Sequence, residues 1–509
     1  MNLNYRVVIR QLGLLLFVLS ALIGAVGLFG VVDRWGDATK STGDVAALFL
    51  TAFVGLVVGG LFHVSGRRMS DTFGQREALL LVALSWILGA GLAALPFRLW
   101  AISRADAAIP HQFDQYVNCY FEAMSGFTTS GATVVESLAT LPRSILLWRS
   151  LTQWLGGLGI VVLFVAVLPM LGVGSRRVFM AEAAGPSPEG VKPRIRDTAR
   201  ILWMIYLGLT VAETLALKVS GMGWFDALCH TMTTLATGGF STQDASIAAF
   251  PSIAMQVIII VFMVLAGINF GLYHQLLQGG WRGVRKDPEL RCYLVIILAA
   301  TAIVTFSIMR TPDADRAVGF ADSLHHSLFQ VVSIQTTTGF CSADFDTWGF
   351  AAKATLFALM FIGGSAGSTS GGIKVVRVLI VAKILLAEIE HAYRPKVVRP
   401  IKIGKGAVET DMKLNTLVFF VGFILAFSTG TIFLMLFEAD NGIDITTAAS
   451  ASVTVLSNIG PGLAKVGATQ NYAWFTASGK IVLSALMLLG RLEMFTLIVL
   501  FSPRFWRTE

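Results

Sequence analysis

Long apolar segments recur along this chain, and short polar or basic stretches separate them. A run of about 20 apolar residues is long enough to cross the roughly 30 Å hydrocarbon core of a membrane as a helix. Two such runs, at about 11–32 and 45–65, come first and are joined by a loop of mixed charge. The pattern therefore predicts a pair of membrane-spanning helices at the start of the chain.

The rest of the chain repeats one pattern four times: an apolar span, a short semi-apolar segment, a polar turn and a second, long apolar run. The opening spans are predicted at about 76–100, 198–219, 291–309 and 413–437, and the closing runs at about 142–173, 251–278, 350–386 and 478–501. An internal repeat of this kind determines the fold. We therefore divide the chain into an N-terminal helix pair, 1–70, and four pore repeats, 71–190, 191–285, 286–390 and 391–509.

Each repeat has a glycine in its polar turn. These glycines are Gly131, Gly238, Gly339 and Gly460. They are 107, 101 and 121 residues apart, by subtraction of their numbers. An Asp opens the short segment before each turn, and Asp is a favoured helix N-cap that complements the positive end of the helix dipole. We expect four short helices that run into the turns, capped by Asp114, Asp226, Asp322 and Asp444.

Composition indicates an integral membrane protein. Of the 509 residues, 55% are hydrophobic and only 14% are charged, and the mean hydropathy is +0.71. Soluble domains carry roughly 25% charged residues. The first apolar run is longer than the roughly 7–15 residues of a signal-peptide core, so we expect it to be retained as a helix. The four cysteines form no CxxC pair, which favours neither zinc nor redox chemistry.

Basic residues gather in alternate loops, and such loops of membrane proteins face the cytoplasm. All of the basic loops fall on one side of the membrane only if each short segment re-enters the membrane rather than crossing it. We therefore expect both termini on the cytoplasmic side and all four turns toward the outside. The basic residues of the inside segments are Arg67, Arg68, Arg76, Arg176, Arg177, Lys192, Arg194, Arg196, Arg282, Arg285, Lys286, Arg394, Lys396, Arg399, Lys402, Lys405, Arg504 and Arg507.

The four turns predict a cation pore, because non-helical backbone at membrane depth is tolerated only inside protein or beside a water-filled cavity. Rings of backbone carbonyls can replace the water around a monovalent cation. The turns contain no carboxylate, which argues against a high-affinity divalent site. The residues expected to line the pore are Thr129, Ser130, Gly131, Ala132, Ala236, Thr237, Gly238, Gly239, Thr337, Thr338, Gly339, Phe340, Asn458, Ile459, Gly460 and Pro461.

The turns and their flanks resemble the filter loops of the Trk/Ktr/HKT superfamily of potassium transporters. The resemblance rests on segments 127–133, 238–241, 329–340 and 457–462 and spans about 76–503. The extra helix pair in front makes the chain more similar to the TrkH/TrkG type than to the shorter KtrB. The resemblance implies an all-α integral membrane protein, with four M1–pore helix–M2 repeats around a pseudo-fourfold pore plus the two N-terminal helices.

The same resemblance implies a bacterial inner-membrane homodimer in which each protomer has its own potassium pore. It also implies a cytoplasmic ring of TrkA-like nucleotide-binding subunits, for which the loop at 387–412 leaves a docking place. In the superfamily, serine in place of the first filter glycine accompanies sodium transport. That position is Gly131 here, so potassium is favoured. Ser130 stands where many relatives have Thr, a departure that we expect to be tolerated.

A run of small residues interrupts the apolar segment at 350–386. Each glycine costs a helix interior about 1 kcal/mol relative to alanine, so a flexible loop near mid-membrane is expected; the alternative is a helical small-residue packing face. In the resembling family, a loop at this place gates the pore, and an arginine of the last span limits the leak of ions. The resemblance implies that role for Arg491; the alternative is a structural ion pair of Arg491 with Glu493 or Glu213. The expected gate residues are Gly363, Gly364, Ser365, Gly367, Ser368, Gly371, Gly372, Lys374 and Arg491.

Other functions stay open from the sequence. A KdpA-like pore subunit of an ATP-driven pump shares the four-repeat pore, and a potassium symporter coupled to sodium or protons is a second alternative. An intramembrane enzyme is remote, since the chain has no HExxH motif. We expect no covalent cofactor, potassium as substrate, the lipid bilayer as surroundings and no nucleic-acid partner. Without a P-loop or a GxGxxG motif in a βαβ setting, any ATP, ADP or NAD is expected on a partner subunit.

Overall fold

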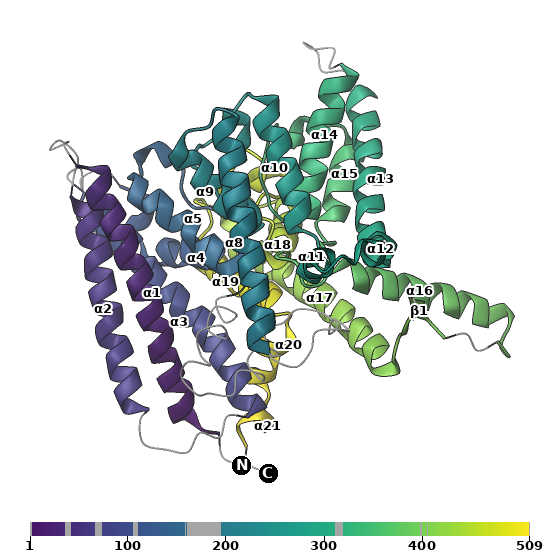
Figure 1. The fold of residues 1–509 in the computed structure, drawn as a ribbon, viewed down its shortest axis with the longest axis horizontal. Coiled ribbons are helices and arrows are strands. Elements are labelled where there is room, and N and C mark those ends of the chain that lie inside the picture. Colours follow the sequence, from purple (N-terminus) through teal and green to yellow (C-terminus); the bar gives the residue numbers. More distant parts are fainter. Residues whose placement is uncertain are drawn as a thin grey trace.

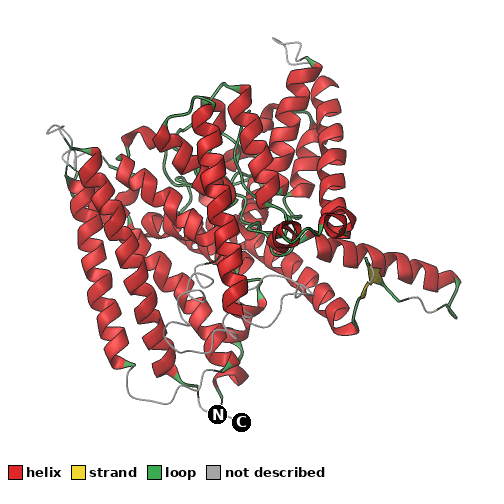
Figure 2. Cartoon of the chain, viewed as in Figure 1, coloured by secondary structure: helices red, strands yellow, loops and turns green. Residues whose placement is uncertain are grey.

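The computed structural model describes residues 3–35, 42–66, 74–104, 110–157, 159, 195–310, 319–397, 400–404 and 406–507. Helices make up nearly all of the regular structure in these ranges (Figure 1, Figure 2). Their one sheet is a short antiparallel hairpin of β1 (Lys402–Ile403) and β2 (Gly406–Ala407). The predicted all-α fold class is confirmed.

The helices follow the predicted order. The N-terminal pair, α1 (Tyr5–Asp33) and α2 (Gly43–Ser65), forms one edge of the molecule (Figure 1). The opening helices of the four repeats are α3 (Gln75–Ile102), α8 (Ile195–Val219), α13 (Pro288–Arg310) and α17 (Thr410–Phe437). The short helices before the turns are α4 (Tyr116–Phe127), α9 (Trp224–Leu235), α14 (Phe320–Gln335) and α18 (Ile445–Leu456). The residue boundaries of the five parts stay a prediction.

The closing runs of the second, third and fourth repeats are each divided between two helices, and most of the first repeat's predicted run beyond residue 157 lies outside the described residues. The closing helices are α5 (Arg143–Gly157), α10 (Ile253–Ala266) with α11 (Phe270–Leu277), α15 (Phe350–Leu359) with α16 (Val375–Tyr393), and α19 (Ala477–Arg491) with α20 (Phe495–Ile498). The chain bends by 91° between α10 and α11 and by 114° after α19. Two short helices, α12 (Trp281–Lys286) and α21 (Pro503–Trp506), complete the described helices.

The runs at 251–278 and 478–501 are helical as predicted, but neither is a straight helix, because each breaks after α10 or α19. Asn269 stops the first run by accepting the Gly271 N–H at 2.7 Å, which caps a new helix in another direction. In the second, Glu493 and Met494 adopt left-handed backbone at φ of 52° and 60°. Hydropathy does not reveal such breaks, since apolar residues continue on both sides.

Six helices of the described residues are long and apolar enough to cross a membrane, or up to eight if each bent pair counts as one span. The chain is therefore a multi-pass membrane protein. Both termini lie at the same end of the molecule (Figure 1), where the Arg76 guanidinium donates to the Arg507 carbonyl at 2.9 Å. Several predicted inside residues lie outside the described residues: Arg67, Arg68, Arg176, Arg177, Lys192, Arg194, Arg399 and Lys405.

The Asp cap prediction is right for Asp444, which caps α18 by accepting the Thr447 N–H. It is wrong for the other three. Asp226 and Asp322 lie inside the first turns of α9 and α14, where a carboxylate still complements the helix dipole. Asp114 precedes α4 and accepts the His111 N–H at 2.7 Å in a separate 3-10 turn.

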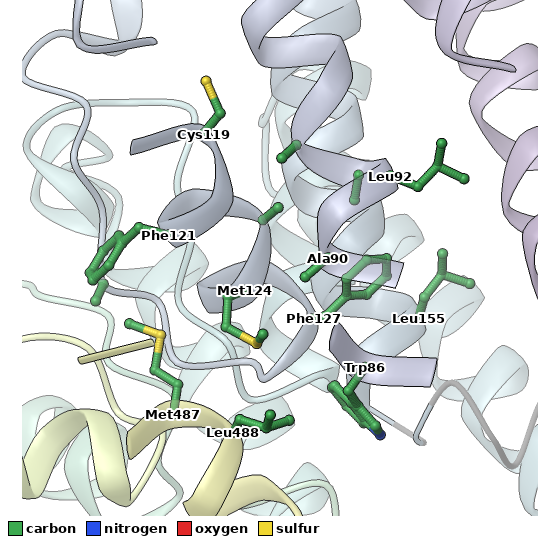
Figure 3. Packing of buried hydrophobic residues seen from close by; sticks show 14 of the residues in the cluster. Trp86, Ala90, Leu92, Cys119, Phe121, Met124, Phe127, Leu155, Met487 and Leu488 are labelled. Carbon is green, nitrogen blue, oxygen red and sulfur yellow. The ribbon is translucent and has the colours of Figure 1, made fainter. Parts of the chain in front are cut away.

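The short helices are enclosed by protein. Around α4, buried apolar side chains come from α3, α5 and α19 as well as from α4 itself (Figure 3). Trp86 and Ala90 of α3 lie on one side of α4, and Met487 and Leu488 of α19 lie on the other (Figure 3). This packing fixes the height and direction of α4, so the turn that follows it starts from a rigid support.

Candidate functional site

Each short helix ends in the same hydrogen-bonded motif. The N–H of Ser130 donates to the Ser125 carbonyl at 2.9 Å, and the N–H of Thr129 donates to the Gly126 carbonyl at 3.0 Å. These are the two bonds of a Schellman motif, which satisfies the last carbonyls of a helix. The equivalent donors in the other repeats are Gly238 and Thr237, Thr338 and Thr337, and Ile459 and Asn458. The motif defines four pore turns: Thr129–Ala132, Thr237–Phe240, Thr337–Phe340 and Asn458–Pro461.

The backbone of the four pore turns matches position by position. The first position has a φ between 52° and 58° in all four turns, at Thr129, Thr237, Thr337 and Asn458. A positive φ is a true outlier for a β-branched residue such as Thr, and strain of this kind concentrates at functional sites. The third position also has a positive φ, and it is glycine in every turn: Gly131, Gly239, Gly339 and Gly460.

This alignment corrects the predicted register of the second turn. Gly239, not Gly238, is the equivalent of Gly131, since Gly239 has the positive φ of 75°. Ala236, expected in the pore, is instead the C-cap of α9 and precedes the turn. Phe240 takes the fourth position. In the other three turns the predicted register agrees with the backbone.

The four turns meet in a closed ring. A Cβ atom added to Gly131 would lie 2.2 Å from the Gly238 oxygen, and one added to Gly239 would lie 2.1 Å from the Thr338 oxygen. A Cβ atom added to Gly339 would lie 1.8 Å from the Ile459 oxygen, and one added to Gly460 would lie 2.6 Å from the Ser130 oxygen. The repeats therefore follow one another around an axis, and the fourth closes on the first. Four second-position carbonyls occupy equivalent places in this ring.

A cavity lies at one side of the ring. The third-position glycine of every turn lines it, together with Glu136, Asp244 and Arg149. Asp244 also joins two repeats, because its carboxylate accepts the Leu138 N–H at 2.6 Å. The cavity thus opens onto all four turns at once.

On the third repeat, residues 360–374 between α15 and α16 form a non-helical loop, which confirms the predicted helix break and excludes a helical small-residue face. The loop reaches the third pore turn, where the Gly371 N–H donates to Thr337 Oγ1 at 2.7 Å. It also reaches the fourth, since a Cβ atom on Gly371 would lie 3.1 Å from the Asn458 Cβ atom. The two ends of the loop meet in an isolated parallel β-bridge between Ile362 and Ile373.

The predicted gate residues Lys374 and Arg491 both contact this region. Lys374 is buried, and its ammonium donates to the Ser370 carbonyl. Arg491 donates to the Thr369 carbonyl at 2.9 Å and to the Gly156 and Gly157 carbonyls at 2.5 and 2.8 Å. Of its two expected acidic partners, Glu493 pairs instead with Arg377 at 2.6 Å, and Glu213 lies buried on α8.

Three polar residues beside the ring were missed from the sequence: Glu122, Arg149 and Gln153. Arg149 and Glu122 form an ion pair of 2.8 Å with side-chain exposures of 2% and 0%. Gln153 is also fully buried and bonds to the second pore turn. An ionisable residue within an apolar segment marks a functional interior. That signal, applied to Arg149, would have pointed here.

The helical membrane fold and the closed ring of four turns are typical of a membrane transport protein. Comparison with known proteins gives the same class. A family model described as TrkH, cation transport protein, matches residues 54–508. The chain belongs to the TrkH family of cation transport proteins.

Known relatives align with this chain over nearly its full length. The Trk system potassium uptake protein TrkH of Halomonas elongata is 39% identical, and that of Salmonella typhimurium is 38% identical; both alignments cover 99% of this chain and 100% of the relative. The crystal structure of the potassium transporter TrkH from Vibrio parahaemolyticus matches with a TM-score of 0.84 and 34% identity. That match covers 99% of this chain and 100% of the other.

Proposed function

We propose that this protein takes up potassium across the bacterial inner membrane through the ring of four pore turns. The observation that carries the proposal is the closed ring, in which each turn places one carbonyl against the glycine of the preceding turn. Ring-shaped sets of backbone carbonyls are suited to a desolvated monovalent cation. The relatives that match over the whole chain are named as potassium uptake proteins.

In this proposal the ion-binding residues are those of the four pore turns, with Phe240 replacing Ala236 in the second. The short helices point their C-terminal ends toward the turns, and the partial negative charge there favours a cation. Both termini are cytoplasmic, and the cavity lined by Glu136 and Asp244 faces the outside. Uptake then runs from the cavity through the ring toward the loop at 360–374.

We further infer that the loop at 360–374, with Lys374 and Arg491, is the gate. Its support is its position, since it bonds to the third pore turn and lies against the fourth. A homodimer and a TrkA-like cytoplasmic ring that binds ATP, ADP or NAD complete the proposal. The helix α16 and the hairpin project sideways from the helical body (Figure 1), which offers a surface for such a partner.

The test is cation uptake into proteoliposomes that contain this protein alone, with potassium, rubidium and sodium compared. We expect potassium and rubidium uptake well above sodium uptake. Gly131→Ser should erode that preference, because a Cβ atom there would collide with the Gly238 oxygen and Gly131 has a φ of 76°. Gly208→Ser is the matched control, since a Cβ atom at Gly208 meets nothing within 4 Å. Uptake that requires ATP hydrolysis would contradict the proposal and favour a pump subunit.

A further inference from the structure

The second pore turn differs from the other three in having two successive glycines, Gly238 and Gly239. At the second position the first turn has Ser130, whose hydroxyl bonds to Thr128 at 3.0 Å, and the third has Thr338, whose hydroxyl bonds to Thr336 at 2.8 Å. Gly238 has no side chain and therefore cannot make an equivalent hydrogen bond. Glycine also has the greatest conformational freedom to lose on folding. The second turn therefore needs a support from outside its own sequence.

Helix α5 of the first repeat provides that support. The Gln153 amide nitrogen donates to the Gly238 carbonyl at 2.6 Å, and the Phe240 N–H donates to the Gln153 amide oxygen at 3.0 Å. One side chain thus holds a carbonyl and an N–H two residues apart. Gln153 is fully buried, so water does not compete for either bond.

Arg149, one helical turn before Gln153, holds the segment that follows the turn. Residues four apart lie on the same face of a helix. The guanidinium donates to the Ser241 carbonyl at 3.2 Å and lies 4.0 Å from the centre of the Phe240 ring. Its ion pair with Glu122 fixes its own position. Two polar side chains of α5 therefore frame the second pore turn.

The carbonyl that Gln153 holds also faces the first pore turn. A Cβ atom at Gly131 would lie 2.2 Å from the Gly238 oxygen, so this carbonyl is the contact between the first two turns of the ring. Its position determines how closely the two turns approach. Displacing it changes the size of the ring and hence the fit of a cation.

We propose that Gln153 is a positioning residue that sets the cation specificity of the pore, by clamping the double-glycine turn at Gly238 and Phe240. The inference rests on the proposed function, because it assigns a role within the same ring. With the clamp present, the ring is held open to the size that suits potassium. Without it, the Gly238–Gly239 segment relaxes and the ring can contract around the smaller sodium ion.

The experiment compares potassium-over-sodium permeability ratios in proteoliposomes for the unchanged protein and three variants. Gln153→Leu removes both bonds at similar volume, and Gln153→Glu keeps the acceptor for Phe240 but loses the donor to Gly238. Gln256→Leu is the control, since this buried glutamine of α10 bonds to the Phe250 carbonyl and to His325 rather than to a pore turn. Thermal stability is measured for each.

Both Gln153 variants should lower the ratio by roughly tenfold, because the Gly238 carbonyl, once it loses its buried hydrogen bond, is free to move and the ring no longer keeps one size. Gln256→Leu should lose stability but keep the ratio. If the Gln153 variants fail to fold, Gly238→Ala tests the same contact, because its Cβ atom would lie 2.4 Å from the Gln153 amide carbon and displace it. An unchanged ratio in the folded variants overturns the inference alone. A pore without potassium preference in the unchanged protein overturns the proposed function instead.

Discussion

At the scale of single residues, the ring depends on four glycines that combine a positive φ with close backbone contacts. Gly239 has a φ of 75°, and a Cβ atom there would lie 2.1 Å from the Thr338 carbonyl oxygen. Backbone strain of this kind costs about 1–3 kcal/mol, and a main-chain oxygen cannot move aside as a side chain can. Gly238 lacks the positive φ and faces the Gln153 side chain instead.

Gly239→Ala should therefore abolish potassium uptake, whereas Gly238→Ala should retain uptake with reduced selectivity. Initial rates of rubidium uptake into proteoliposomes, normalised to the amount of inserted protein, measure the difference. Gly208→Ala serves as the control because that position is open. Equal losses in the two variants would mean that the second turn does not have the register that its backbone angles indicate.

The ion pair of Glu122 and Arg149 is the second residue-scale feature. Glu122 also accepts the Val134 N–H at 3.0 Å, and Arg149 donates to the Ser241 carbonyl, so the pair joins the segments that follow the first and the second pore turn. Removing one member leaves a buried charge without its partner, which costs about 3 kcal/mol or more. Glu122→Gln should lower the free energy of unfolding by that order, as measured by thermal or denaturant unfolding in detergent.

The control for this change is Asp33→Asn, which weakens the ion pair with Arg143. That pair is at the surface, with Arg143 59% exposed, and surface pairs contribute about 1 kcal/mol or less. A Glu122→Gln variant as stable as the Asp33→Asn variant would show that the buried pair is not a structural element of the ring.

At the scale of elements, the features that could be predicted from the sequence are those that depend on the length of an apolar segment and on the composition of a turn. The helix order and the four turns follow from both signals, and the break at 360–374 follows from its glycines. The bends after α10 and α19 were hidden, because the two helices on either side of each break are together apolar enough to pass as one span. The register of the second turn was hidden too, since either Gly238 or Gly239 can take a left-handed conformation and only the helix end decides between them.

The same limit applied to side-chain contacts. Gln153 and Arg149 are visible as polar residues on α5, but their partners lie 85 and 92 residues later in the chain, at Gly238 and Ser241. Periodicity places residues on a face of their own helix and is silent on which neighbour that face meets. The two partners come close to α5 only because the repeats follow one another around the ring.

The loop at 360–374 is held at its base by α13. One carboxylate oxygen of Glu289 accepts the Ala366 N–H at 2.7 Å and the Val376 N–H at 3.1 Å. Each buried N–H left without an acceptor costs about 1–3 kcal/mol. Glu289→Ala should loosen the loop and raise potassium flux through the protein without a regulatory partner several-fold, within the range that a coupling of about 1 kcal/mol allows.

Proteoliposome flux at matched protein density measures this effect. Glu289→Gln keeps an acceptor oxygen and should behave more like the unchanged protein, and Glu388→Ala, at an exposed position of α16, should leave flux unchanged. Flux that falls in Glu289→Ala, in step with lost stability, would show that the loop supports conduction rather than restricting it.

At the scale of the whole molecule, Arg491 joins three of the four repeats on the loop side of the ring. It belongs to the fourth repeat, binds Thr369 of the third and binds Gly156 and Gly157 at the end of α5 in the first. Hydrogen bonds from a charged donor contribute about 1.5–3 kcal/mol each. These hydrogen bonds hold the ends of closing helices from different repeats close together. A partner that opens the pore therefore has to break them.

Arg491→Gln should weaken that restraint while keeping a shorter hydrogen-bonding side chain. We expect higher potassium flux in the absence of a partner and a smaller further increase when a TrkA-like ring and nucleotide are added. Selectivity should not change, because Arg491 contacts the loop and helix ends rather than the pore turns. The potassium-over-sodium ratio thus distinguishes the ring of pore turns from the loop at 360–374. Variants at Gln153 should alter the ratio, and variants at Arg491 should alter only the amount of flux. A changed ratio in Arg491→Gln would mean that gate and ring are one mechanical unit.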